Sequence, residues 1–321
     1  MSSNVQGALF ALLAFGIYAT HDVVVKFLGV DFHAIQIIFF AGLLSFPLVT
    51  VMLMNDRTDG HLRPVHPWWT ALRTISTVIT GVSAFYAFSV LPLAQTYAIL
   101  FAAPLLITLI AIPVLGEKVG LRRGLAVLVG LLGVLIVLRP GSAPLSLGHM
   151  AALAAAVFSS LASVVVRKIG SDERSVVLLL YPMVANFVVL GLALPFVYRP
   201  MEIHQIGMLG IISLFGFIAT LLIIMAYRRA EAVIVAPMQY SQMIWAAFYG
   251  YLIFDEVPDE WTLVGAGVII ASGIYIVMRE GKTAVSENRP VLGTRSRPET
   301  GVMPRISLLL RRRANRDLSE G

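Results

Sequence analysis

Charged side chains are scarce inside the long apolar segments of this chain, so the few that occur there indicate its chemistry. Asp22 and His21 lie in the first apolar segment, and Arg73 lies in the third. A charge in such a segment is costly and normally faces a cavity or a partner. Asp22 stands four residues before Lys26, the spacing of an ion pair on one helix face, and Tyr18 shares that face. Asp22 is therefore either a structural partner of Lys26 or of nearby backbone, or a group that binds a ligand or a proton.

His21 and the lack of cysteine limit the kinds of functional site that this chain can form. A buried histidine is usually a hydrogen-bonded packing residue, and a binding role for His21 is the alternative. No second histidine or acid stands at ligand spacing, so a metal site is not expected. The sequence has no cysteine, which excludes disulfides, thiol nucleophiles and thiolate metal sites. Without a Ser/His arrangement or a glycine-rich phosphate loop, we expect neither an enzyme nor a bound cofactor.

Arg73 begins a polar stripe in the third apolar segment. The stripe continues at helical spacing with Ser76, Thr77, Thr80 and Ser83. Arg73 and Thr77 are therefore expected to line a cavity. An arginine near the end of a segment could instead extend to the membrane surface.

A second polar face lies in the ninth apolar segment. Gln239, Gln242, Trp245 and Tyr249 follow one another at spacings of 3, 3 and 4 residues. Amides orient a ligand, and aromatic rings offer stacking surface for a flat one. The alternative is a belt of aromatics at the membrane interface, which fits Tyr249 better than the mid-segment Trp245. Gln239, Gln242 and Trp245 are therefore candidate binding residues.

The composition indicates a membrane protein. Of 321 residues, 58% are hydrophobic and 13% are charged, and the mean hydropathy is +0.85. Soluble domains carry about 25% charged residues. The pI near 9.7 does not indicate nucleic-acid binding, because the bases fall in short loops and in the last 40 residues.

Ten segments have the roughly 20 mostly apolar residues that a membrane-spanning helix needs. We therefore predict an all-α integral membrane protein, whose tail over 282–321 is basic and disordered. The first segment lacks the basic start and the cleavage site of a signal peptide, so we interpret it as a retained span. The predicted spans are 5–28, 33–54, 68–90, 93–115, 121–138, 147–168, 175–198, 204–227, 232–254 and 261–279.

Loop charges predict the orientation. With the N-terminus in the cytoplasm, the external loops and flanks hold three bases, Lys26, Arg139 and Arg199. Both termini are then cytoplasmic by the positive-inside rule. At about 1.5 Å per residue, Asp22 and Arg73 are separated by roughly 15 Å along the membrane normal, so we expect them to serve different ends of a pathway. The cytoplasmic loops hold ten bases, Arg57, Arg63, Lys118, Arg122, Arg123, Arg167, Lys168, Arg174, Arg228 and Arg229.

The two halves of the chain repeat each other at an offset of about 140 residues. Residues 7–29 match 148–170, with "VVV" and a base in each, and Glu117 meets Glu256. Each half holds five spans, an odd number, so the second half must cross the membrane in the opposite sense. We therefore predict two inverted repeats, 1–141 and 147–281, in which Glu117 and Glu256 are structural acids at loop ends.

One module marks both halves. It comprises Pro104, Gly116, Glu117, Gly130, Gly133, Arg139, Pro140 and Gly141 in the first, and Glu256, Gly267, Gly273 and Gly281 in the second. The chain thereby resembles the drug/metabolite transporter superfamily, in particular its EamA-type ten-helix members. "HDVVVK" (21–26) and residues 72–95 resemble a bacterial branch with S-adenosylmethionine and riboflavin uptake systems and amino-acid exporters. Ala41 departs from that branch, which often has arginine there, and this weakens any transfer of substrate.

This resemblance and the buried polar groups predict a secondary transporter of a small organic metabolite, acting by alternating access in the inner membrane as a monomer or homodimer. Uptake of a heteroaromatic metabolite, similar to riboflavin or S-adenosylmethionine, is the favoured form, and export of amino acids is the alternative. An intramembrane enzyme or a channel lacks support in the motifs. The expected partners are the substrate, the lipid bilayer, and a coupling proton or counter-substrate.

Overall fold

The computed structural model describes residues 3–54, 63–116, 119–140, 145–170, 172–173, 175–230 and 232–281. Several sequence predictions concern positions outside these residues. They are the loop bases Arg57, Lys118 and Arg174, the loop-end acid Glu117, the motif glycine Gly141 and the tail over 282–321.

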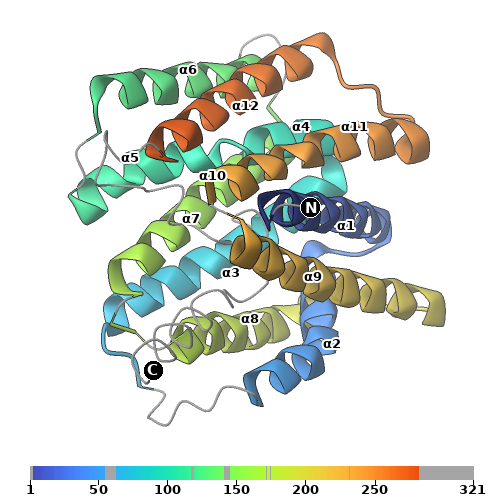
Figure 1. The fold of residues 1–321 in the computed structure, drawn as a ribbon. Helices are drawn as coiled ribbons and strands as arrows, with labels where there is room; N and C mark the ends of the chain where they lie inside the picture. Colours follow the sequence, from blue (N-terminus) through green and yellow to red (C-terminus); the bar gives the residue numbers. More distant parts are fainter. Residues whose placement is uncertain are drawn as a thin grey trace.

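The described part of the chain is a bundle of helices (Figure 1). Eight helices or helix pairs in it are long and apolar enough to cross a membrane. The helices are α1 (Ser3–Asp31), α2 (Ala34–Met54), α3 (Pro67–Val90), α4 (Leu93–Leu100), α5 (Ala103–Leu115), α6 (Leu121–Leu138), α7 (Leu147–Ile169), α8 (Ser175–Val197), α9 (Ile203–Arg229), α10 (Ala232–Val235), the 3-10 helix η1 (Ala236–Tyr240), α11 (Ser241–Phe254) and α12 (Glu260–Gly281).

Two of the ten predicted spans differ from a single long helix. The predicted span 232–254 is divided into α10, η1 and α11, because Pro237 has no N–H to donate and interrupts the helical ladder. The predicted span 33–54, in contrast, is one helix, α2. The span 93–115 is one apolar run made of two helices, α4 and α5.

Helices from the two halves of the chain pair with each other. The most extensive contacts join α1 to α9, α3 to α7, and α6 to α12, and α2 packs on α8. Figure 1 shows α6 and α12 side by side along one edge of the bundle. Helix α11 packs on both α1 and α4, so these three helices form one group.

Glycines bring α6 and α12 into close contact, as small residues do between membrane helices. A Cβ on Gly265 would lie 2.6 Å from the Gly133 carbonyl oxygen, and one on Gly133 would lie 2.9 Å from the Gly265 carbonyl oxygen. Not every glycine of these helices lies in the contact, because a Cβ added at Gly124 or Gly267 would meet nothing within 4 Å.

Candidate functional site

Two breaks in apolar helices lie beside the residues of the candidate site. Helix α4 ends at Leu100 and α5 begins at Ala103, and Pro104 cannot donate to the carbonyl four residues before it. In the corresponding span of the second half, Pro237 lies in η1, directly before α11. Broken helices are tolerated at membrane depth where they line a cavity or are buried in protein, and these breaks lie next to Tyr97 and Gln242.

Asp22 on α1 is completely buried and is held by two side chains. The Tyr97 hydroxyl of α4 donates a hydrogen bond to Asp22 Oδ2, and His21 Nδ1 lies 2.8 Å from Asp22 Oδ1. The His21 ring meets Phe85 edge-on, with centroids 6.0 Å apart. His21 therefore has the hydrogen bond and the packing contact expected of a buried histidine, and its binding role stays a prediction.

Lys26 does not pair with Asp22, so the ion pair suggested by their four-residue spacing is wrong. Lys26 Nζ lies 2.6 Å from Glu256 Oε1 and donates to the Leu91 carbonyl at 2.5 Å. The long, flexible lysine stem reaches past the next helical turn to the end of the bundle, where a carboxylate and a free carbonyl are available. The partners of Asp22 are therefore the interior side chains Tyr97 and His21.

Gln242 on α11 completes this interior group. It is fully buried, and its Nε2 donates to the Tyr97 hydroxyl at 3.3 Å. Its Oε1 is buried and has no hydrogen-bond partner. Gln242, Tyr97, Asp22 and His21 form what we call the Asp22 cluster, which joins α11, α4 and α1.

The Asp22 cluster combines a carboxylate with a vacant amide acceptor. Gln242 Oε1 is one of several buried side-chain atoms of the described residues that have no hydrogen-bond partner within the protein. The vacant Gln242 Oε1 can accept a hydrogen bond from a ligand N–H or O–H, and the carboxylate favours a positive charge or a proton nearby. In the described part of the chain, no group of three or more His, Cys, Asp or Glu side chains is arranged to hold a metal ion.

Tyr18 and the polar stripe that begins at Arg73 lie outside the Asp22 cluster, where α1 meets α9 and α3 meets α8. The Tyr18 hydroxyl is 2.8 Å from Thr220 Oγ1 on α9. Arg73 Nη1 donates to the Leu178 carbonyl on α8, and Thr77 Oγ1 donates back to the Arg73 carbonyl at 2.9 Å. Arg73 and Thr77 are both buried. The predicted separation of Arg73 from Asp22 stays a prediction.

The face predicted on the ninth span is divided by the break in that span. Gln239 is half-buried in η1, whereas Gln242 turns into the Asp22 cluster. Trp245 is 37% exposed and stacks on Tyr249 with centroids 6.0 Å apart. A Cβ on Gly16 would lie 3.4 Å from the indole, so Trp245 packs against α1 rather than inside the cluster.

Tyr97 is the member of the cluster that sequence reasoning did not select. It lies in an apolar run with no charged neighbour, and it is 75 residues from Asp22. The available signal was its position one turn before a helix break marked by Pro104. A tyrosine that is fully buried among apolar residues usually has a partner for its hydroxyl.

Each half of the chain matches the same known protein family. The EamA-like transporter family matches this chain twice, over residues 5–139 and 146–279. The chain belongs to the EamA-like transporter family. Both matched stretches contribute to the Asp22 cluster of this EamA-family protein, through Asp22 and Tyr97 in the first and Gln242 in the second.

Curated relatives of this EamA-family protein are transporters with different named solutes. An S-adenosylmethionine uptake transporter of Rickettsia bellii is 25% identical, covering 82% of this chain and 90% of the relative. A riboflavin transporter of Vibrio cholerae is 28% identical, covering 88% and 96%. The pseudopaline exporter CntI of Pseudomonas aeruginosa is 26% identical, covering 84% and 95%. The relatives support a multi-pass membrane transporter with a small-molecule substrate.

Proposed function

We propose that this protein is a secondary transporter that moves a small organic metabolite across the inner membrane by alternating access. The observation that carries the proposal is the Asp22 cluster, in which helices from both halves of the chain share a buried carboxylate. Secondary transporters bind their solutes near the midplane, at discontinuous helices where two repeats meet. The breaks before Pro104 and at Pro237, which make two of the predicted spans discontinuous, support this proposal.

Two inverted repeats, 1–141 and 147–281, are part of the proposal. The first predicted span pairs with the eighth (α1 with α9) and the third with the sixth (α3 with α7), and exchanging the two halves converts one pairing into the other. The second pairs with the seventh and the fifth with the tenth, and the exchange leaves these pairings unchanged. This pattern is expected of a two-fold relation between the halves. With an odd number of predicted spans in each half, this relation supports opposite membrane orientations, and the loop charges support cytoplasmic termini.

The substrate we favour is a heteroaromatic metabolite that carries a hydrogen-bond donor or a positive charge. Gln242 Oε1 and the Asp22 carboxylate would receive the polar part, while Gln239 and Trp245 are candidates along its route. Uptake is supported by the relative named for S-adenosylmethionine uptake, and a heteroaromatic substrate is supported by this relative and by the one named as a riboflavin transporter. Export of amino acids or related metabolites is the alternative, supported by the relative named as an exporter.

The energy source is proposed to be an ion gradient or exchange, because the sequence has no nucleotide-binding motif. Asp22 is the candidate carrier of a coupling proton, and a counter-substrate is the other possibility. Arg73 and Thr77 are proposed to act near the cytoplasmic end of the same pathway, and Tyr18 to align α1 with α9.

Counterflow in proteoliposomes tests the proposal. Purified protein is reconstituted with a panel of vitamins, nucleosides, amino acids and S-adenosylmethionine, and uptake of each labelled solute is measured against an internal pool. We expect one class to exchange, and Asp22→Asn to reduce that exchange by at least about tenfold, because a charged contact is worth about 1.5 kcal/mol or more.

The matched control is Ser45→Ala. Ser45 is also buried, but its hydroxyl donates only to the Ala41 carbonyl of its own helix α2. It should transport like the unmodified protein. Exchange of no solute would contradict the transporter, and full exchange by Asp22→Asn would contradict the assignment of the site.

A further inference from the structure

One end of the bundle carries an ion pair that belongs to no binding role discussed so far. Lys26 at the end of α1 and Glu256 in the loop between α11 and α12 meet at 2.6 Å. Their side chains are 10% and 22% exposed, so the pair is largely protected from solvent. The loop charges predict that this end of the bundle faces outside. Lys26 comes from the first half of the chain and Glu256 from the second.

The pair is bonded to the backbone of a third segment, the turn between α3 and α4. Lys26 Nζ donates to the Leu91 carbonyl at 2.5 Å, and the Leu93 N–H donates to Glu256 Oε2 at 3.1 Å. The Glu256 N–H in turn donates to the carbonyl of Gly250, near the end of α11, at 2.9 Å. Four bonds therefore tie the ends of α1, α4 and α11 together at one point.

The three tied helices are those that hold the Asp22 cluster. Asp22 is one helical turn from Lys26 on α1, and Tyr97 is one turn from Leu93 on α4. On α11, Ala246 lies one turn beyond Gln242 in the direction of Gly250. The ion pair therefore lies between the Asp22 cluster and the nearest end of the bundle.

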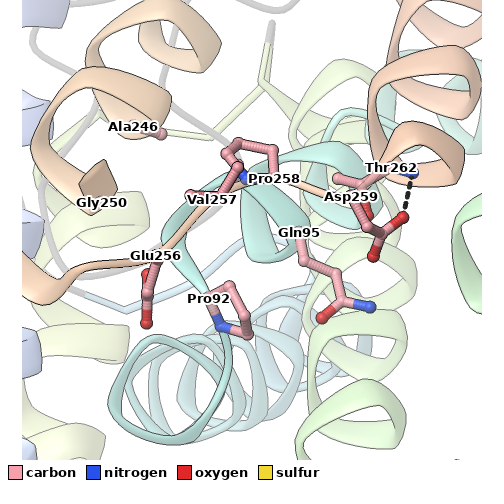
Figure 2. Close-up of a pocket in the computed structure, with 10 residues that line it drawn as sticks. Pro92, Gln95, Ala246, Gly250, Glu256, Val257, Pro258, Asp259 and Thr262 are labelled. Atoms are coloured by element: carbon pink, nitrogen blue, oxygen red, sulfur yellow. Dashed lines mark hydrogen bonds between the residues drawn. The ribbon is translucent and has the colours of Figure 1, made fainter.

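The space beneath the ion pair is small. A cavity of about 40 Å³ lies there, lined by Ala246, Gly250, Glu256 and Asp259 together with other residues of the α3–α4 turn, α4, the α11–α12 loop and α12. Figure 2 shows Glu256 and Pro92 on one side of this cavity and Gln95 on another. Such a volume holds a few water molecules, whereas pockets for organic ligands measure about 300 Å³ or more. This cavity is too small to hold an organic metabolite.

We infer that Lys26 and Glu256 form the gate of the Asp22 cluster on the predicted external side, and that the gate opens when this ion pair separates. The inference rests on the proposed transport function and assigns the residues that control access to its site. In alternating access the two halves must part at one end while they close at the other. Here the parting requires Lys26 to leave both Glu256 and the Leu91 carbonyl.

A second ion pair at the same end supplies a matched control. Arg139 Nη2 lies 2.7 Å from Asp259 Oδ2, also between the two halves, but these side chains are 29% and 43% exposed. Exposed pairs contribute little because water and salt screen them. Asp259 lines the same cavity as Glu256 and shares its charge, but it is more exposed, has no bond to the α3–α4 turn and accepts instead from the Thr262 N–H at the start of α12.

Thiol labelling tests the gate without any solute. The chain has no cysteine, so Ala246→Cys, at a position 1% exposed between the cluster and the gate, gives a single reactive site. The variant is reconstituted in nanodiscs, which leave both faces accessible, and its rate of reaction with a water-soluble maleimide is measured. We expect Glu256→Gln and Lys26→Met each to raise this rate about tenfold, the effect of losing one charged hydrogen bond, and Asp259→Asn to leave it unchanged.

Equal labelling rates with and without Glu256→Gln would overturn the gate, as would an equal increase in Asp259→Asn. Glu256→Gln retains an oxygen that can accept from Leu93, and Lys26→Met tests the same pair from the other partner if one variant does not fold. Failure of the gate is distinguishable from failure of the transport proposal. If solutes exchange but the gate variants leave the labelling rate unchanged, only the gate is contradicted. If the gate variants raise the labelling rate but no solute exchanges, only the transport proposal is contradicted.

Discussion

Removing one hydroxyl group tests whether the Asp22 cluster is a connected network. In Tyr97→Phe, Asp22 Oδ2 loses a donor and Gln242 Nε2 loses its acceptor, and Asp22, Tyr97 and Gln242 are all fully buried. Hydrogen bonds between side chains in membrane proteins average about 0.6 kcal/mol, with a maximum near about 1.7. The bond to the Asp22 carboxylate is charge-assisted and belongs at the upper end.

The expected loss of stability follows from the two bonds. The bond from Gln242 is 3.3 Å long, beyond the usual distance, and should contribute about 0.5 kcal/mol. Together with about 1.5 kcal/mol for the bond to Asp22, Tyr97→Phe should lower the free energy of unfolding by about 2 kcal/mol. Gln242→Leu should cost less in the Tyr97→Phe background than in the unmodified protein, because the bond between them is already lost.

Steric trapping in nanodiscs measures this free energy of unfolding within a bilayer. Tyr86→Phe is the matched control, because Tyr86 is a half-buried tyrosine of α3 whose hydroxyl bonds to no side chain or backbone group, and it should change stability by less than about 0.5 kcal/mol. If Tyr97→Phe is no more costly than Tyr86→Phe, the network does not hold the three helices together. Additive effects of Tyr97→Phe and Gln242→Leu would show that these two residues are not coupled.

Two further expectations concern helix packing. Gly265→Ala should lower stability by about 1–3 kcal/mol, because its Cβ would lie 2.6 Å from the Gly133 carbonyl oxygen. The control Gly267→Ala lies on the same helix, where its Cβ meets open space, and should not lower stability. Equal effects of the two variants in thermal denaturation would refute the close contact. Thr220→Val should lower the free energy of unfolding by about 0.6 kcal/mol, because it removes the hydrogen bond to Tyr18. In the Tyr18→Phe background this bond is already lost, so Thr220→Val should lower the free energy of unfolding no further.

Much of the architecture is determined by the sequence alone. Composition and the length of the apolar runs identify a membrane protein, since few charged residues are tolerated in a bilayer. Spacing along one helix identified Asp22 and Gln242 as inward-facing polar groups, and both are completely buried. The repeated module identified the family, and the family matches both halves of the chain.

Tertiary structure decided which of these groups meet. Sequence spacing indicates which residues share a helix face, but a side chain bonds to whatever lies within its reach on a neighbouring helix. Lys26 therefore takes Glu256, 230 residues away, rather than Asp22 one turn away. Tyr97 reaches Asp22 because α4 and α1 both pack on α11, a contact that no local pattern records. Asp22 is completely buried because its face of α1 meets α4, where the Tyr97 hydroxyl donates to its carboxylate.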